Sequence, residues 1–326
     1  MMKKTELYPL QFVPQYKSRL WGGKKFNTLF NRNVEGHPLG ESWEVSGLKK
    51  MPSIVYNGSF KGQSLHSLIE QFPEAILGKR VLEQFGQNFP LLIKFIDARL
   101  PLSVQVHPND ALAKARHNCF GKNEMWYVLE AEPYAELVLG FKNKLTKERF
   151  SQLQSDASLE KELHTEKVKK GDVISVPAGL LHAIGGGILL AEIQQASDIT
   201  YRVYDYDRVD EKTGAKRELH QELALDAINF SLEKQGVVPY DQKTNHPNTL
   251  VKTPYFTTAF LSLDGLYSMD YSNRKAFSVL ICVEGKLTVT VNDHLLSLEK
   301  GQCALIPAAL NQVIFHGKGQ LLDVTV

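Results

Sequence analysis

The sequence lacks the features that would direct it to a membrane, a nucleic acid or an oxidising compartment. Its three cysteines, Cys119, Cys282 and Cys303, have no Cys-x-x-Cys spacing, which argues against a disulfide framework and a thiolate metal cage. No apolar run approaches about 18 residues, and no apolar segment follows the lysines near the N-terminus. Because 38 Lys+Arg balance 36 Asp+Glu, there is no basic excess. We therefore expect a cytoplasmic protein that binds neither membranes nor nucleic acids.

The sequence does contain enough apolar residues for one large or two ordinary domains. Its 326 residues are 43% hydrophobic. Short apolar runs separated by Gly, Pro and Asn are typical of strands and turns, so most of the chain is expected to be β. Residues 89–98 predict a strand buried on both faces, and MWYVLEAE followed by AELVLG predicts a hairpin.

A few segments predict short helices beside these strands. Helical spacing of apolar residues indicates one helix after Ser64, and a second is expected from Glu74 to Phe85. Asn109 or Asp110 can cap a third, Thr146 can cap a fourth, and residues 217–228 contain a fifth. The sequence therefore predicts a small helical layer.

A short internal repeat links two distant parts of the chain. GDVISVPAGLLH (171–182) and GQCALIPAALNQ (301–312) share a Gly, then Pro-Ala after five residues, and a Leu at the tenth position. The first copy ends in His182 and the second in Gln312. This difference indicates two similar β units, of which one is active and one is structural.

The polar residues Ser103, Gln105 and His107 are spaced by two, so a strand would present all three on one face. Glu124 opens the next predicted strand, where a buried carboxylate would need a cation or hydrogen-bond donors. Taken alone, a strand histidine is usually a packed or hydrogen-bonded residue, and Lys122 with Glu124 would form a solvated turn. The chemical interpretation therefore depends on these residues meeting.

The spacing of the first repeat, Gly-x5-Pro-x-Gly-x2-His, resembles the second cupin motif. The upstream segment fits a modified first motif, in which Gln105 and His107 replace the usual paired histidines and Glu124 and Gly140 follow. Cupins are small double-sheet jelly rolls with one metal inside. Over nearly its whole length the chain resembles the short bacterial type I mannose-6-phosphate isomerases, in the segments WGG, GESWEVSG, LSVQVHP, GKNEMWYVL, VPAGLLHAIGGG and AEIQQASDITYRVYDYDR.

This resemblance implies a mostly β fold of two cupin-type jelly-roll barrels with a small helical layer. Residues 1–240 would form the catalytic domain, and residues 241–326 a degenerate cupin-like domain. The resemblance also implies one Zn²⁺ per chain, held by Gln105, His107, Glu124 and His182.

The implied reaction interconverts mannose 6-phosphate and fructose 6-phosphate through an enediol or enediolate. The residues carried over as catalytic are Arg202, Glu192, Lys122 and Asp198. Those carried over for substrate binding are Ser103, Lys122 and Arg208. The general base stays open, as does the choice between monomer and dimer. The phosphate contacts of the long members do not transfer directly, because the stretch after Arg202 reads VYDYDR.

Two other classes of function are compatible with a cupin. A metal held by two histidines and one carboxylate suits a non-haem iron oxygenase, although Gln105 as a fourth ligand argues against it. A non-catalytic sugar-binding or regulatory cupin would keep the barrel, but it would not need Lys122, Glu192 and Arg202 together.

Overall fold

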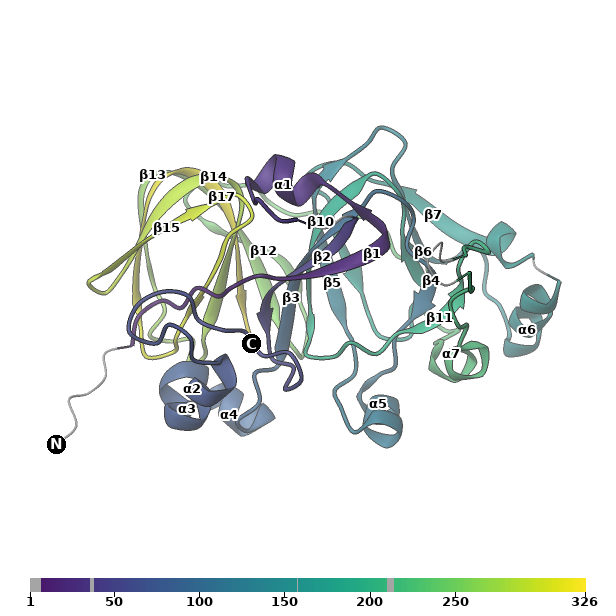
Figure 1. Cartoon of the computed structure of the whole chain (residues 1–326), viewed down its shortest axis with the longest axis horizontal. Coiled ribbons are helices and arrows are strands. Elements are labelled where there is room, and N and C mark those ends of the chain that lie inside the picture. Colours follow the sequence, from purple (N-terminus) through teal and green to yellow (C-terminus); the bar gives the residue numbers. More distant parts are fainter. Residues whose placement is uncertain (1–6, 36–37, 157, 210–213) are drawn as a thin grey trace.

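The computed structural model describes residues 7–35, 38–156, 158–209 and 214–326. Within these ranges the strands form three sheets with antiparallel pairing. Figure 1 shows the C-terminal strands gathered at one end of the molecule and the remaining strands at the other. The prediction of a mostly β chain with a small helical layer is confirmed. None of the three sheets, as far as the described residues show, closes into a hydrogen-bonded barrel.

The first sheet has the strand order β1-β2-β3-β10-β5-β8. Its strands are β1 (Gln15–Gly23), β2 (Leu39–Ser46), β3 (Leu91–Ala98), β10 (Ile188–Gln195), β5 (Glu124–Ala131) and β8 (Val173–Val176). Every residue of β3 is buried, as the continuous apolar run predicts. The neighbours of β3 in the sheet are β2 and β10, so this strand lies in the interior.

The second sheet has the order β11-β4-β9-β6-β7. Its strands are β11 (Tyr201–Tyr204), β4 (Val104–Val106), β9 (His182–Ile184), β6 (Glu136–Phe141) and β7 (Leu163–Lys167). The predicted hairpin of β5 and β6 is wrong, because β5 belongs to the first sheet and β6 to the second. Both edges of β5 are occupied, by β10 and β8, so the turn after β5 carries the chain to the other sheet.

The third sheet contains the C-terminal strands in the order β12-β13-β17-β14-β15, with β16 paired to β14. The strands are β12 (Pro247–Lys252), β13 (Thr257–Asp270), β17 (Gln312–Thr325), β14 (Ser278–Val291), β15 (His294–Glu299) and β16 (Cys303–Ile306). The long β13 and β14 both pair with β17.

The helices are short and lie outside the sheets (Figure 1). They are α1 (Lys25–Phe30), α2 (Leu65–Gln71), α3 (Pro73–Leu77), α4 (Lys79–Phe85), α5 (Asp110–His117), α6 (Lys147–Ser155) and α7 (Gln221–Ala227), with a 3₁₀ turn at Leu159–Glu162. The side chains of Ser64, Asn109 and Thr146 cap α2, α5 and α6.

The single helix expected from Glu74 to Phe85 is wrong, because Gly78 divides it into α3 and α4. Gly78 has a φ of +86°, which other residues rarely adopt. A Cβ at this position would lie 2.3 Å from the carbonyl oxygen of Lys275, so the helices approach the C-terminal part too closely for a side chain.

One apolar core joins the C-terminal part to the rest. Phe89 stacks on Phe277 with ring centroids 4.6 Å apart, and Leu10 pairs with Leu305 through backbone hydrogen bonds. The boundary between residues 240 and 241 stays a prediction. In the described ranges, no helix has the length and apolar character needed to span a membrane.

Candidate active site

Three strand ends bring His107, Glu124 and His182 together. His107 directly follows β4, Glu124 is the first residue of β5, and His182 is the first residue of β9. Gln105 in β4 lies opposite His182 on one side and Arg202 of β11 on the other. The alternation predicted for residues 103–107 therefore turns polar side chains toward one point.

The turn before β9 depends on a glycine. Gly179 has a φ of +87°, and its N–H donates to the carbonyl oxygen of His107 at 3.0 Å. A Cβ here would lie 2.9 Å from the Cβ of Asn229. The turn therefore holds the end of β4 close to the start of β9, and so positions His107 near His182.

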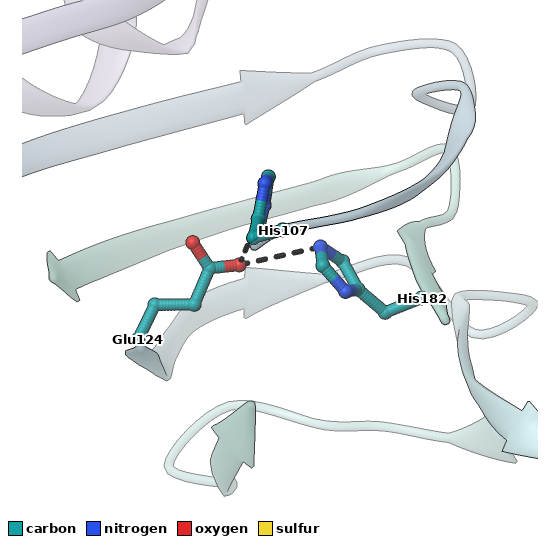
Figure 2. A group of neighbouring side chains, drawn as sticks. All are labelled: His107, Glu124 and His182. Carbon is teal, nitrogen blue, oxygen red and sulfur yellow. Dashed lines mark ion pairs between the residues drawn. The ribbon is translucent and has the colours of Figure 1, made fainter. Parts of the chain in front are cut away.

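The three side chains form a buried group, in which the candidate ligand atoms all lie within 4.8 Å of one another. Oε1 of Glu124 lies 3.4 Å from Nε2 of His182 and 3.7 Å from Nε2 of His107 (Figure 2). Each of the three residues is only 1% exposed. The three side chains are thus shielded from bulk water.

Backbone carbonyls orient both imidazoles. Nδ1 of His107 lies 2.9 Å from the carbonyl oxygen of Ile199, and Nδ1 of His182 lies 2.9 Å from that of Leu180. Because a carbonyl only accepts, Nδ1 carries the proton in each ring and the Nε2 lone pair faces the group. Burial lowers the pKa of both histidines, and that of His182 to about 3, so the rings are neutral.

Glu124 is ionised and only half satisfied. Burial would raise its pKa, but the charge of Lys122 outweighs burial and holds the pKa well below its usual range. Oε2 of Glu124 accepts from Lys122, which also donates to Nε2 of His107 at 2.9 Å. Oε1 is buried and has no hydrogen-bond partner among the described residues.

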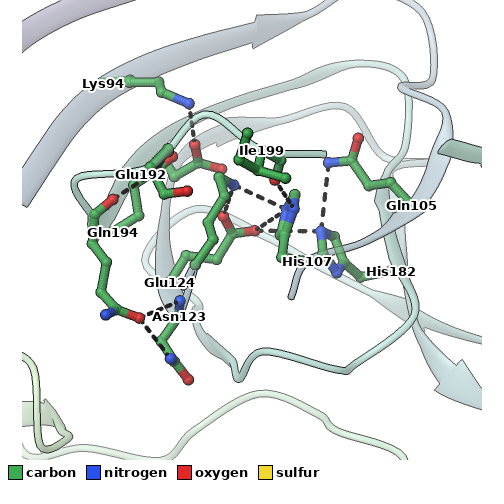
Figure 3. Close-up of polar contacts among 12 residues, drawn as sticks. Lys94, Gln105, His107, Asn123, Glu124, His182, Glu192, Gln194 and Ile199 are labelled. Atoms are coloured by element: carbon green, nitrogen blue, oxygen red, sulfur yellow. Dashed lines mark hydrogen bonds and ion pairs between the residues drawn. The ribbon is translucent and has the colours of Figure 1, made fainter. Parts of the chain in front are cut away.

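This donor set fits a divalent cation. Two neutral imidazole nitrogens and an ionised carboxylate oxygen converge, and the carboxylate has a buried oxygen that no protein donor satisfies. The amide of Gln105 lies beside them, with Nε2 3.5 Å from Nε2 of His182 (Figure 3). Rotation of this amide would turn its oxygen toward the group.

A cavity of about 720 Å³ opens next to these residues. Ser103, Gln105, Lys122, Glu192, Asp198 and Arg202, all predicted as site residues, line it. Its lining also contains Lys17, Arg19, Lys94 and Arg217, so the walls are rich in cationic groups. Such a cavity favours an anionic ligand of small-molecule size.

Glu192 and Asp198 occupy different environments. Glu192 in β10 is buried, accepts from Lys94 at 2.8 Å (Figure 3) and accepts from Nε1 of Trp126 at 3.0 Å. Asp198 is exposed in the connection after β10. Within the described residues it forms no ion pair with Arg202.

Arg202 keeps most of its guanidinium free of carboxylates. Its Nη1 donates to the carbonyl oxygen of Glu218 at 2.7 Å, and its Nε is buried with no hydrogen-bond partner in the described ranges. Burial, followed by the charge of Arg217, lowers the pKa of Arg202. The side chain is therefore fixed, charged and incompletely satisfied.

The prediction for Arg208 fits the structure poorly, because this residue is not among those that line the cavity. Its guanidinium is turned onto Asp205 and the carbonyl oxygen of Pro101. The sequence reasoning also missed Lys94, whose signal was a lysine inside the apolar run 89–98. Arg217 was missed too, because it lies in a polar segment without strand periodicity.

Comparisons with known proteins agree with this geometry. Residues 9–153 match the type I phosphomannose isomerase catalytic domain, and residues 246–326 match the mannose-6-phosphate isomerase cupin domain. The mannose-6-phosphate isomerase ManA of Bacillus subtilis is 35% identical over 317 residues, which cover 96% of this chain and 98% of that protein. The chain belongs to the type I mannose-6-phosphate isomerase family.

Further members of the mannose-6-phosphate isomerase family support this placement. The enzyme of Streptococcus mutans is 32% identical over 96% of this chain and 97% of its own length. The crystal structure of the Bacillus subtilis mannose 6-phosphate isomerase superposes with a TM-score of 0.89 and 31% identity, covering 98% of this chain and 99% of that one. The predicted cupin-type fold and the predicted enzyme class, an isomerase, are confirmed.

Proposed function

We propose that this enzyme interconverts mannose 6-phosphate and fructose 6-phosphate with one Zn²⁺ per chain. The observation that carries the proposal is the buried group of His107, Glu124 and His182, whose neighbours Gln105 and Lys122 line a cation-rich cavity. The family supports an aldose–ketose isomerase rather than an oxygenase or a non-catalytic cupin. We infer the sugar from the related enzymes, which are mannose-6-phosphate isomerases.

The proposed metal ligands are Gln105, His107, Glu124 and His182. Two imidazoles, a carboxylate and a neutral amide oxygen suit Zn²⁺, which does not change oxidation state during a proton transfer. When bound, the metal would supply Lewis acidity and orientation for the sugar oxygens. The unsatisfied Oε1 of Glu124 supports this assignment.

The chain itself would supply the groups that handle the proton and the developing charge. The isomerisation moves a proton between C1 and C2, so it needs a base and an electrophile. Both oxygens of Glu192 accept hydrogen bonds from Lys94 and Trp126, whereas Asp198 accepts none within the described residues. This contrast favours Asp198 as the base and Glu192 as the partner that orients Lys94.

Arg202 would stabilise the negative charge that develops on the enediolate oxygen. Its guanidinium is fixed by the carbonyl of Glu218 and retains an unpartnered Nε, as a preorganised donor should. Ser103 and Lys122 would contact the substrate from the cavity wall. Arg208 is withdrawn from this set, since its side chain faces Asp205 and Pro101.

The test is a comparison of two sugars on the purified protein. We expect reversible conversion of mannose 6-phosphate to fructose 6-phosphate and much poorer turnover of unphosphorylated mannose, because the cationic cavity uses binding energy on the phosphate. Equal values of kcat/KM for the two sugars would contradict the proposal and indicate an isomerase of neutral sugars. A cytoplasmic location and the lack of nucleic-acid binding remain predictions, and the oligomeric state stays open.

A further inference from the structure

Two arginines after β11 share one buried carboxylate. Asp205 is 5% exposed, and its Oδ1 accepts from Nη2 of both Arg208 and Arg217. Nε of Arg217 also donates to Oδ2 of Asp205 at 2.8 Å. The two arginines nevertheless have different surroundings, and this difference suggests different roles.

Each of the three guanidinium nitrogens of Arg208 donates to a protein oxygen. Its Nη2 donates to Asp205, its Nε donates to the backbone carbonyl of the same residue at 3.2 Å, and its Nη1 donates to the carbonyl of Pro101. Its side chain does not line the cavity. All three nitrogens are thus used to fasten Asp205 to the loop that precedes β4.

Arg217 is held from one side only. Nε and Nη2 form a two-point contact with Asp205, and Nη1 has no hydrogen-bond partner among the described residues. Arg217 lines the same cavity as Ser103, Gln105 and Arg202. Asp205 therefore fixes the orientation of the guanidinium while leaving donors for a ligand.

The corner around these residues has an excess of positive charge. Arg202, Arg208 and Arg217 face one buried carboxylate, that of Asp205, while the carboxylate of Glu218 is exposed. Besides burial, the charges of Arg217 and Arg208 both lower the pKa of Arg202, so each of them repels the Arg202 guanidinium. A bound dianion would relieve this repulsion and satisfy the buried Nε of Arg202.

The cluster of Arg202, Arg217 and Asp205 also lies near the candidate metal ligands. Gln105 lies opposite His182 in the sheet, and Arg202 lies opposite Gln105 on the next strand. Nη1 of Arg202 donates to the carbonyl oxygen of Glu218, the residue that follows Arg217, and both arginines line the cavity, so they lie close together. A sugar bound there with its reacting carbons near His182 would therefore have Arg217 available for its far end.

We propose that Arg217, oriented by Asp205, is the specificity-determining residue that binds the phosphate group of the substrate, and that Arg208 is a positioning residue for Asp205. This inference rests on the proposed function and deepens it. Lys17 is the rival, because it lines the cavity and its ammonium contacts, among the described residues, only Sδ of Met51 and the ring of Trp43. Arg217 is preferred since its planar donors are fixed by an ion pair, whereas a lysine side chain presents a mobile point charge.

The experiment measures kcat and KM for mannose 6-phosphate and for mannose in the metal-loaded parent enzyme and in four variants. In Arg217→Ala we expect KM for mannose 6-phosphate and the inhibition constant of inorganic phosphate to rise about 10- to 100-fold, as for loss of a hydrogen bond to a charged group. The value of kcat/KM for mannose should fall much less. Arg217→Lys should give an intermediate loss, and it provides the same comparison if the alanine variant does not fold.

The other variants separate the roles. Arg208→Ala should lower the thermal midpoint while retaining most of the preference for the phosphorylated sugar. Arg149→Ala, an exposed arginine of α6, serves as the matched control and should change neither. The inference would be overturned if kcat/KM fell equally for both sugars in the Arg217 variants. It would also be overturned if Lys17→Ala lost the preference for the phosphorylated sugar while Arg217→Ala kept it fully. A parent enzyme without any preference for the phosphorylated sugar would overturn the proposed function as well.

Discussion

The two copies of the repeated β unit have the same order of strand, turn and strand but different surroundings. β8, its turn and β9 correspond to β16, its turn and β17, and both copies begin with a glycine of positive φ, +90° at Gly171 and +85° at Gly301. His182 opens β9 as a buried residue, whereas Gln312 opens β17 as an exposed one. The repeat therefore determines the order of the elements, and the residue at its end and the strands around it determine whether a ligand can bind.

The strands that face each copy show why only one is functional. The first copy meets β4 and β5, which bring Gln105, His107 and Glu124 to His182. The third sheet encloses an aliphatic and aromatic cluster that includes Leu280, Leu287, Val289 and Phe315. A ligand site thus requires polar side chains from several strands, and a single motif does not create one.

A buried polar network in the C-terminal part surrounds Asp323, and both of its carboxylate oxygens accept hydrogen bonds. Asp323 accepts from Tyr271 at 3.0 Å and from the two terminal nitrogens of Arg274 at 2.9 and 2.6 Å. This network differs from the group around Glu124, which keeps an unsatisfied oxygen. Saturated polar groups brace a fold, whereas unsatisfied ones are available to a ligand.

The largest expected effect comes from giving the first copy the residue of the second. His182→Gln removes an imidazole ligand, so we expect loss of bound zinc and at least an about 100-fold fall in kcat, the size typical for loss of one preorganised electrophilic contact. Elemental analysis and turnover of mannose 6-phosphate on the same preparation check this. Full metal content in the variant would show that His182 is not a ligand.

The next effect concerns the mechanism rather than the metal. Arg202→Ala should lower kcat by about 10²- to 10³-fold, because one preorganised donor to the developing charge is lost. Zinc content and thermal midpoint should stay close to those of the parent, since the Arg202 side chain donates only to the carbonyl of Glu218 in the described chain. A falling midpoint with unchanged kcat would instead assign Arg202 to bracing the sheet.

In protein freed of metal by a chelator, low pH should weaken the fold through the buried His182 of the first copy. Burial lowers the pKa of His182 from 6.5 to about 3, so the unfolded chain takes up a proton in this window and the folded chain does not. The stability that this difference provides is therefore present above pH 6.5 and is lost as the pH falls toward 3. Urea unfolding at several pH values should show a shallower acid limb in His182→Gln than in the parent; identical limbs would refute this.

Alkali should act through the C-terminal network. Burial, with the charge of Asp323, raises the pKa of Tyr271 well above 10, so above pH 10 the unfolded chain loses this proton while the folded chain keeps it. The contribution of Tyr271 to the free energy of unfolding is therefore present below pH 10 and is lost as the pH rises further. Tyr271→Phe should cost about 1 kcal/mol at neutral pH through the lost hydrogen bond. It should also flatten the alkaline limb of the unfolding free energy. An unchanged alkaline limb would show that another group governs it.

The smallest effect is expected from the reverse exchange. Gln312→His gives the second copy the histidine of the first, and Asp270 lies opposite this position on β13, but the described residues hold no group of three metal-binding side chains there. Because the position is exposed, stability should change by less than about 0.5 kcal/mol. Zinc content should stay at the level of the parent. A second equivalent of tightly bound zinc would break the distinction between the two copies.

The sequence predicted local structure best where one periodic signal dominated. The buried β3 and the caps at Ser64, Asn109 and Thr146 follow from nearby residues. The division of the helix at Gly78 could not be foreseen, because its cause is the backbone of Lys275, almost two hundred residues away. The assignment of β5 and β6 to different sheets likewise depends on pairing with distant strands.

The same limit applies to the site. The spacing of Gln105 and His107 and the turn before His182 predicted which groups could converge. Arg208 and Arg217 could not be distinguished, since only the structure shows that one is saturated by Asp205 and Pro101 while the other lines the cavity.

The most direct test of the central claim is metal removal and restoration. The account predicts about one zinc per chain in the purified protein, loss of mannose 6-phosphate isomerisation after chelation, and recovery when one equivalent of zinc is returned. His107→Ala should fail to recover under the same treatment. Full isomerase activity in protein shown by elemental analysis to be free of metal would contradict the account.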